Sequence, residues 1–285
     1  MLPVAKRTLP VIDAFALATF RYAIAAVLFV LALAVLEGRP SLQYGGKLLP
    51  ATVFGIIGIT GFNILVWFGL GSTRPEHAAI ILALQTPLTA LAVWVARSQR
   101  PAGFTLICVA VALAGVALVV TKGDPLRAIE GGELLGDMLV FLGALSWVIY
   151  ALAAGNFAGW SPLRFTALTS VPGAIGIALT YATAIGAGAA VIPDMEALRS
   201  VAWQLAYFVL GSTVLGVFSF NAAVPRLGPL NAMLMLNFIP VGVFAIEAAL
   251  GRSFTSIELA GAGVVVGALV ANNLYLRHRS NSAIS

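Results

Sequence analysis

The sequence predicts an all-α protein that crosses a membrane many times, and three observations lead to this fold class. Of the 285 residues, 60% are hydrophobic and 9% are charged, whereas about 25% of the residues in an ordinary soluble domain are charged. The mean hydropathy is +1.01. The apolar residues also form runs of about 20 residues, the length that a helix needs to cross the hydrocarbon core. This composition argues against a soluble enzyme, a disordered chain and a nucleic-acid-binding protein.

Nine apolar runs predict nine transmembrane helices. Short connections with glycine, proline and single charges separate these runs, as is typical of membrane loops. The runs do not alternate between apolar and polar residues at every second position, which argues against membrane strands. The predicted helices cover residues 13–36, 48–70, 77–96, 102–121, 134–156, 162–190, 200–224, 229–250 and 256–276.

An internal repeat is the most informative feature of the chain. A shift of 153 positions places Pro87 on Pro240 and Gly58 on Gly211. The stretch 13–21 has a looser counterpart about 148 positions further on. Because four helix types also recur in the same order, the sequence predicts a true structural repeat rather than a chance likeness of apolar helices.

The repeat predicts two units, residues 1–125 and residues 126–285. Five helices are an odd number, so two five-helix units in one membrane have opposite orientations. The helix predicted at 134–156 has no counterpart ahead of residue 13. We therefore expect a ten-helix protein of two inverted repeats whose first helix precedes Met1.

The charged loop residues predict the orientation in the membrane. Lysine and arginine are nearly balanced between the two faces, but the basic C-terminal tail and the concentration of acids on the other face favour a cytoplasmic C-terminus. We expect a multi-pass protein of a bacterial inner membrane. The C-terminal face carries Arg39, Lys47, Arg97, Arg100, Arg164, Arg226, Arg277 and Arg279, and the opposite face carries Lys6, Arg7, Arg74, Lys122, Arg127, Arg199 and Arg252.

Catalytic chemistry has little support in the sequence. Two histidines and one cysteine, Cys108, do not form the usual zinc or thiol sites. No Gly-Lys-Ser or Gly-Lys-Thr phosphate-binding motif is present. We therefore expect no enzyme activity, no metal and no cofactor, and transport would use a gradient of the substrate or of a coupled ion.

Three ionisable residues lie within predicted spans, where charges are costly and therefore functional candidates. Arg21 is one third of the way into its helix and either snorkels to the interface or pairs with an acid. Asp137 is one turn inside its helix, so an interaction with the helix dipole competes with a functional role. Glu247 either reaches the interface or takes part in ion coupling.

Amide, imidazole and aromatic side chains recur at helical spacing on several spans. His77, Gln85 and Thr89 share one helix face. Polar side chains of this kind can simply join neighbouring helices, or they can line a cavity that holds a ring and a zwitterion. The predicted substrate site consists of Asn63, Trp67, His77, Gln85, Trp147, Tyr150, Phe218, Asn221 and Asn237.

Proline and glycine predict where the helices bend and approach one another. Pro87 and Pro240 each remove an amide hydrogen and free the carbonyl four residues earlier, at Ala83 and Leu236, so that each can act as a hinge. Small residues permit close helix packing in membranes. The glycines expected at such contacts are Gly55, Gly58, Gly61, Gly261, Gly263 and Gly267.

These motifs resemble the EamA-type exporters of the drug/metabolite transporter superfamily, and within them the aromatic amino-acid exporters. Two positions depart from the family pattern. Arg252 stands where the family usually has glutamate, and the first repeat has Trp94 at the position that corresponds to Glu247 in the second repeat. The motifs that carry the resemblance are Phe20-Arg21-Tyr22, Gln85-Thr86-Pro87, Pro240, Glu247, Leu250-Gly251, Gly261 and Gly267.

The resemblance implies ten helices in two inverted five-helix repeats and export of aromatic amino acids through a central cavity. It implies that the cavity is lined by the spans that hold Trp67, His77, Trp147, Asn221 and Asn237. We expect a monomeric secondary transporter of small zwitterionic metabolites that works by alternating access and contacts only its substrate and membrane lipid. Export of threonine or homoserine, purines or drug-like amines remains an alternative, as does a non-transporting helical scaffold.

Overall fold

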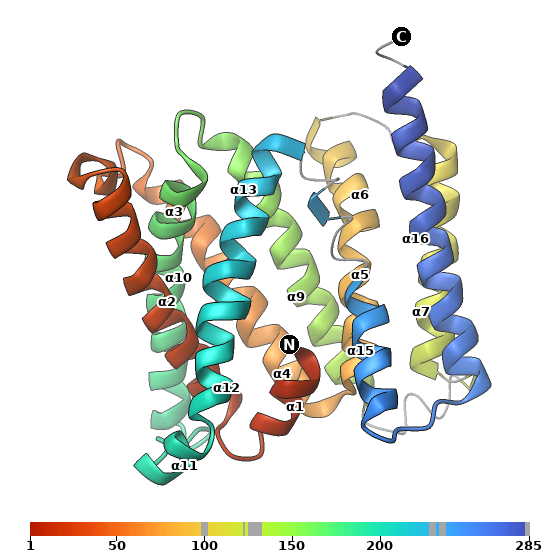
Figure 1. Ribbon diagram of the computed structural model, residues 1–285, viewed down its shortest axis with the longest axis horizontal. Helices are drawn as coiled ribbons and strands as arrows, with labels where there is room; N and C mark the ends of the chain where they lie inside the picture. Colours follow the sequence, from red (N-terminus) through yellow and green to blue (C-terminus); the bar gives the residue numbers. More distant parts are fainter. Residues whose placement is uncertain (98–101, 122, 125–132, 228–231, 234–237, 283–285) are drawn as a thin grey trace.

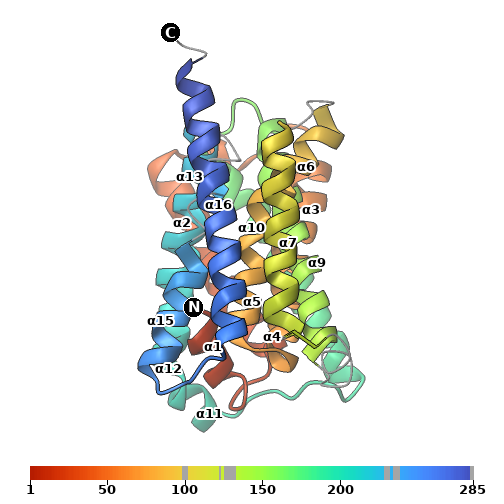
Figure 2. The ribbon, with the colours of Figure 1, turned by 90° about the vertical axis from the view of Figure 1, so that its right-hand side faces the viewer.

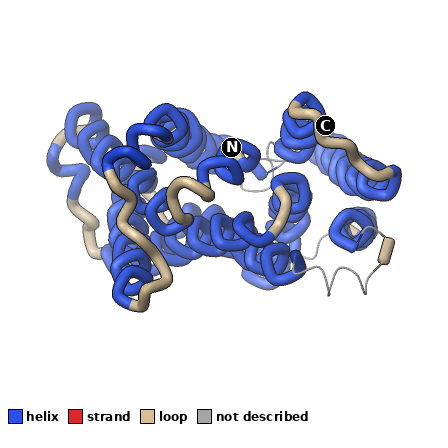
Figure 3. Tube along the Cα trace, turned by 90° about the horizontal axis from the view of Figure 1, so that it is seen from below, coloured by secondary structure: helices blue, strands red, loops and turns tan. Residues whose placement is uncertain are grey.

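The computed structural model describes residues 1–97, 102–121, 123–124, 133–227, 232–233 and 238–282. All regular elements in these ranges are helices (Figure 3). Eight of the described helices are long and apolar enough to cross a membrane, and Ile239–Ala249 is a shorter apolar helix. The predicted all-α, polytopic fold class is confirmed.

The elements follow one another along the two halves of the chain. In the first half they are α1 (Leu2–Thr8), α2 (Ala14–Leu36), η1 (Arg39–Leu42), α3 (Leu48–Gly55), η2 (Ile56–Gly61), α4 (Phe62–Ser72), α5 (Pro75–Ala83), α6 (Gln85–Arg97) and α7 (Gly103–Thr121). In the second half they are α9 (Glu133–Ala153), η3 (Ala154–Asn156), α10 (Pro162–Gly186), α11 (Met195–Ser200), α12 (Ala202–Ala206), η4 (Tyr207–Val217), α13 (Phe218–Leu227), α15 (Phe238–Ala249) and α16 (Ser256–Ser282).

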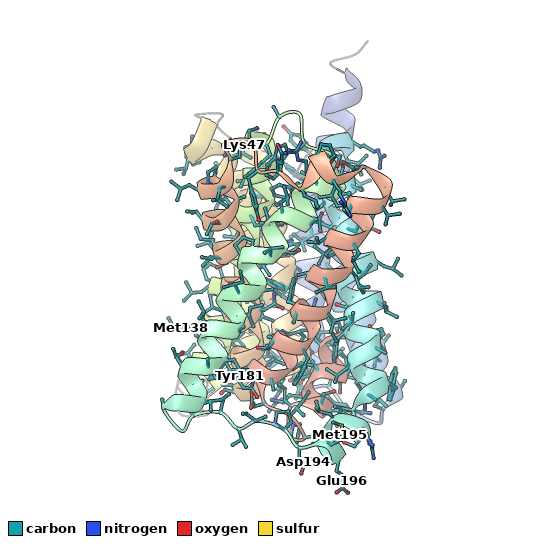
Figure 4. All side chains as sticks on the ribbon, turned by 90° about the vertical axis from the view of Figure 1, so that its left-hand side faces the viewer. Lys47, Met138, Tyr181, Asp194, Met195 and Glu196 are labelled. Carbon is teal, nitrogen blue, oxygen red and sulfur yellow. The ribbon has the colours of Figure 1, made fainter. Side chains whose placement is uncertain are left out.

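The helices stand side by side with their connections at the two ends of the bundle (Figure 1). The closest neighbours are α2 with α10, α4 with α9, and α7 with α16; Figure 2 shows the last pair from the side. Figure 4 places Lys47 at one end of the bundle and Asp194 at the other. We call these the Lys47 end and the Asp194 end. Helix α2 runs toward the Lys47 end and α10 runs away from it, as an inverted repeat requires.

Local structure agrees with both predicted repeat offsets. Elements η2 and η4 are π-helical, and a shift of 153 positions carries η2 onto residues 209–214, inside η4. At the second offset, Asp13 Oδ1 accepts a hydrogen bond from the Ala16 amide (2.8 Å) and Ser161 Oγ accepts one from the Arg164 amide (2.9 Å). Asp13 and Ser161 are thus the N-cap residues of α2 and α10. The predicted boundary between residues 125 and 126 lies outside the described residues.

The helix predicted at 77–96 is interrupted just ahead of Pro87. Helix α5 ends at Ala83 and α6 begins at Gln85, and the Leu84 amide donates to the Ile81 carbonyl (3.0 Å), a tight 3₁₀-type turn. Pro87 is the third residue of α6, where a backbone amide has no intrahelical partner, so the proline costs no hydrogen bond. Pro240 has the same place in α15. The helix is thus interrupted three residues ahead of Pro87, and the hinge at this proline stays a prediction; Leu236 lies outside the described residues.

Three of the predicted glycine contacts are tight. A Cβ atom on Gly58 would collide with the Tyr150 side chain, and one on Gly55 would collide with the Thr169 carbonyl. A Cβ atom on Gly261 would lie 2.9 Å from the Gly115 carbonyl oxygen. These glycines therefore set the distances between η2 and α9, between α3 and α10, and between α7 and α16.

The prediction of close contacts was wrong for two glycines of α16. A Cβ atom on Gly263 or Gly267 would meet nothing within 4 Å. Gly261 faces α7, and positions two and six residues further along a helix point to other sides. At Gly61 the contact is looser, with the Ser146 hydroxyl 3.3 Å from the Cβ position.

These two environments predict different effects of the same substitution. Gly261→Val forces α7 and α16 apart and should lower the free energy of unfolding by about 1–3 kcal/mol, the usual cost of overpacking. Gly263→Val in the same helix is the matched control and should change stability little. Thermal unfolding in lipid nanodiscs measures both, and equal melting temperatures for the two variants would contradict this packing.

Candidate functional site

A buried arginine lies between the two halves of the bundle. The Arg21 side chain on α2 is 2% exposed. Its Nε donates a hydrogen bond to Thr213 Oγ1 of η4, Nη1 donates to Asn63 Oδ1 of α4 (3.3 Å), and Nη2 donates to Ser212 Oγ (3.2 Å). All three partners are neutral. The guanidinium thus joins one helix of the first half to the π-helical segment of the second.

Aromatic rings cover the remaining sides of this guanidinium. Arg21 Cζ lies 5.2 Å from the centroid of the Tyr22 ring and 5.5 Å from that of Trp67. Trp67 Nε1 also donates to Asn63 Oδ1 (3.1 Å), so the amide is held in place. Within the described part of the chain, Arg21 forms no ion pair with a carboxylate. The positive charge is therefore solvated by dipoles and rings but not neutralised.

A second cluster gathers aromatic side chains around Trp147. The Trp147 ring centroid lies 5.2 Å from Phe62, 5.2 Å from Tyr150 and 5.3 Å from Phe220. Tyr150 in turn lies 5.1 Å from Phe165. Helices α4, α9, α10 and α13 each contribute to this aromatic cluster, in which the rings pack against one another.

An amide stands at the edge of the aromatic cluster. Asn221 Nδ2 donates to Tyr150 Oη (3.0 Å) and to Thr166 Oγ1 (2.9 Å). Its Oδ1 is buried and has no hydrogen-bond partner among the described residues. Asn221 and Phe165 also line a pocket of about 140 Å³ near the α9–α10 connection. Lys47 Nζ donates to the Ala158 carbonyl in that connection (3.0 Å), so the pocket belongs to the Lys47 end.

Helix α4 connects the arginine to the aromatic cluster. Its neighbouring residues Phe62 and Asn63 point to different groups, Phe62 to Trp147 and Asn63 to Arg21. Trp67, one turn further along, makes an edge-to-face contact with Phe208 in η4 (5.9 Å). The cation and the rings therefore form one continuous region across both repeats.

A third group of polar residues lies at the other end of the bundle. His77 of α5 is fully buried, with Nδ1 3.5 Å from Asp137 Oδ2 and 3.7 Å from Glu133 Oε2 of α9. Thr73 Oγ1 donates to Asp137 Oδ1 (2.5 Å). Asp137 therefore contacts Thr73 and His77 in addition to lying near the N-terminus of its own helix, where an interaction with the helix dipole was the alternative expectation.

Ion pairs surround this charged cluster. The fully buried Glu76 pairs with Arg252. Arg74 lies 2.8 Å from Glu133 and 3.4 Å from Glu258. A pocket of about 310 Å³ opens beside these pairs and is lined in part by Thr73, Arg74, Glu133, Glu247 and Arg252. Glu247, the residue predicted for ion coupling, is half-buried at this pocket.

The structure brings five of the nine predicted site residues into two neighbouring groups and places three of the others elsewhere. Asn63 and Trp67 lie with Arg21, whereas Trp147, Tyr150 and Asn221 form the aromatic cluster and its edge. His77 lies in the charged cluster instead, and Gln85 is buried at the start of α6. Asn237 lies outside the described residues.

Phe218 does not contact Trp147. It packs against the buried cluster that contains Phe29 and Leu33 of α2 and Leu168 of α10, whereas Phe220 lies beside Trp147. Thr213 was not among the predicted site residues. Its repeat counterpart at the 153 offset is Thr60, which is likewise buried within a π-helical segment. The occurrence of threonine at both equivalent positions is the sequence signal that could have identified Thr213.

The charged cluster predicts a large stability effect of one substitution. Arg252→Gln leaves the Glu76 carboxylate buried without its cation and should destabilise the protein by about 3 kcal/mol or more at neutral pH. Arg199→Gln removes an exposed arginine near the same end of the bundle and serves as the control. Thermal unfolding in nanodiscs compares the two, and adding Glu76→Gln should restore most of the loss. Equal stability of Arg252→Gln and the control would show that the ion pair does not matter.

Comparison with known proteins places this arrangement in a family. The sequence profile described as the EamA-like transporter family matches residues 1–121 and 134–274. The uncharacterized transporter YrdR of Bacillus subtilis is 27% identical over 281 residues, which cover 97% of this chain and 88% of the relative. The uncharacterized transporter YyaM of the same organism is 28% identical over 274 residues, with 95% and 88% covered.

A solved structure shares the fold. A crystal structure of another protein superposes with a TM-score of 0.68 over 96% of this chain and 91% of the other, at 19% sequence identity. An identity this low supports the helix arrangement alone. The two separate matches to one family profile are in keeping with the two repeats inferred from the offsets.

Proposed function

We propose that this chain, which belongs to the EamA-like transporter family, exports small zwitterionic metabolites and prefers aromatic amino acids. The observation that carries the proposal is an aromatic cluster flanked by two uncompensated polar groups of opposite character. One is the Arg21 guanidinium and the other is the Asn221 amide oxygen. A free amino acid presents a carboxylate, an ammonium group and a side chain, and each has a chemical complement here.

The carboxylate of the substrate would bind to Arg21. A buried cation without a counter-ion is costly in a membrane, and an anionic ligand removes that cost. Thr213, Ser212 and Asn63 occupy the guanidinium with weaker, neutral acceptors. A carboxylate that displaces them forms shorter, charge-assisted hydrogen bonds, which are about twice as strong.

The ring would bind nearer the Lys47 end. Because the carboxylate and the ammonium group of an α-amino acid share one carbon atom, the ammonium group would stay close to Arg21, where Asn63 Oδ1 can accept its N–H once the carboxylate has taken the guanidinium. Asn221 Oδ1 is buried without a hydrogen-bond partner among the described residues and can accept a hydrogen bond from a ring N–H, such as that of an indole. Tyr150 Oη lies 3.0 Å from Asn221 Nδ2. Trp147, Phe62 and Phe220 supply the faces and edges for an aromatic side chain. Each favourable ring pair contributes about 0.5–1.5 kcal/mol beyond the burial of its area.

The helix interruptions support an alternating-access mechanism. The break at Leu84 and the π-helical segments η2 and η4 lie within membrane spans next to the candidate site. Such irregular segments allow one part of a span to move against the rest. In the predicted orientation, with the C-terminus in the cytoplasm of a bacterial cell, the pocket beside Asn221 faces the cytoplasm and is the entry route.

Counterflow in proteoliposomes tests the proposal. Liposomes loaded with unlabelled tryptophan should accumulate labelled tryptophan when the protein is present. A competition panel of phenylalanine, threonine, homoserine, a purine and an aromatic amine ranks the alternative substrates. If threonine, homoserine, the purine or the aromatic amine inhibits tryptophan counterflow more strongly than phenylalanine does, the preferred substrate belongs to the class of that competitor and not to the aromatic amino acids.

Two tryptophans provide a matched pair for the site itself. Trp147→Ala opens the aromatic cluster and should lower tryptophan counterflow by about tenfold, the equivalent of one good ring contact. Trp203→Ala removes a tryptophan of α12 that is 64% exposed and should leave counterflow unchanged. Asn221→Ala should resemble Trp147→Ala. Wild-type rates in Trp147→Ala and Asn221→Ala at equal membrane abundance would refute the assignment.

A further inference from the structure

The His77–Asp137 contact has unused hydrogen-bonding capacity. His77 is fully buried, and neither of its ring nitrogens has a hydrogen-bond partner within the described residues. Asp137 Oδ2 is also buried without a partner, 3.5 Å from His77 Nδ1. Thr73 already donates to the other oxygen of Asp137, so Oδ2 is the atom that faces the imidazole. Buried polar atoms without partners are rare and call for an explanation.

The surrounding charges favour one additional positive charge. Among the described residues of this cluster and its pocket, four cations accompany five carboxylates when Asp137 is counted. The Lys6 ammonium donates its hydrogen bonds to the carbonyls of Leu70, Gly71 and Thr73 at the end of α4. Of these charged groups Glu133 of α9 contacts His77 itself. The others pair with one another or line the adjacent pocket; they are Lys6 and Arg7 of α1, Arg74 before α5, Glu76 of α5, Glu247 of α15, Arg252 before α16 and Glu258 of α16.

The missing charge fits a proton better than a metal ion. No group of three or more potential metal-binding side chains occurs in the described part of the chain. Hard cations prefer oxygen ligands, whereas imidazole accepts and releases a proton near neutral pH. A proton on the His77–Asp137 pair would turn the 3.5 Å approach into a charge-assisted hydrogen bond.

A path for protons is present on one side. Thr73 and Glu133, which both contact the pair, line the pocket of about 310 Å³ at the Asp194 end. Water in this polar pocket can bring a proton to Glu133, whose Oε2 lies 3.7 Å from His77 Nδ1. The proton site is therefore reached from the end of the bundle opposite the Asn221 pocket.

We propose that the His77–Asp137 pair binds the proton that this transporter exchanges for its substrate, an inference that rests on the proposed function. One proton enters from the pocket at the Asp194 end and binds between His77 Nδ1 and Asp137 Oδ2. It is released toward the Lys47 end while one substrate molecule moves in the opposite direction. No covalent bond of the substrate changes. His77 and the Leu84 break belong to the same span, so protonation acts on the helix that also bends beside the substrate site.

Two transport measurements separate proton coupling from substrate binding. Wild-type proteoliposomes should show tryptophan counterflow without a gradient and uphill accumulation when a pH gradient is imposed. Asp137→Asn and His77→Gln should keep counterflow and lose the gradient-driven accumulation. Glu196→Gln neutralises an exposed carboxylate at the same end of the bundle and should keep both activities.

Glu247→Gln decides between the two carboxylate sites. Gradient-driven accumulation that persists in Glu247→Gln and is lost in Asp137→Asn supports the His77–Asp137 pair. The reverse pattern overturns it, and so does a wild type with counterflow but no response to the pH gradient.

A measurement without substrate keeps the two proposals distinguishable. Infrared difference spectra of the His278→Gln protein, in which His77 is the remaining histidine, are recorded between about pH 8 and about pH 5. Imidazole or carboxyl protonation bands that disappear with His77→Gln and with Asp137→Asn support the proton site even if tryptophan counterflow is absent, in which case the substrate proposal alone fails. Spectra unchanged by both substitutions overturn the proton site.

Discussion

The packing at the centre of this molecule depends on the need to solvate one buried charge, the Arg21 guanidinium. A cation buried in the hydrocarbon region needs polar partners from protein, because lipid tails supply none. Three elements far apart in the sequence, α2, α4 and η4, meet around it and present a threonine, an amide, a serine and two aromatic rings. None of these partners carries a negative charge. The two repeats are thus joined at a buried positive charge, which in the proposed mechanism the substrate carboxylate neutralises.

The bundle also separates the tasks that transport requires. Rings and an open amide oxygen lie toward the Lys47 end, ion pairs and the His77–Asp137 pair lie toward the Asp194 end, and Arg21 lies between them. Irregular helical segments occur where these groups meet. Close packing through Gly69, Gly136 and Gly261 holds α-helical parts of the spans together. In the proposed mechanism the spans bend at the π-helical segments and at the Leu84 break.

The sequence alone predicted eight of its nine spans as the structure describes them, and local structure matches both repeat offsets, because these features depend on local composition. It did not predict which polar side chains meet. His77 and Gln85 share one face of an ideal helix, but the interruption at Leu84 places them in different helices, and His77 joins α9 carboxylates instead. Phe218 and Phe220 lie on opposite sides of α13, one toward α2 and one toward Trp147. Such choices depend on the neighbouring helices.

Equilibrium binding to the protein in nanodiscs, with tryptophan and with tryptamine as ligands, tests the central role of Arg21 most directly. The two ligands share the ring and the ammonium group and differ in the carboxylate. The wild type should bind tryptophan about tenfold or more tightly than tryptamine, as expected for a charge-assisted contact, and Arg21→Met should bind the two equally. Equal affinities in the wild type, or an undiminished preference for tryptophan in Arg21→Met, would contradict the assignment of Arg21 as the carboxylate-binding residue.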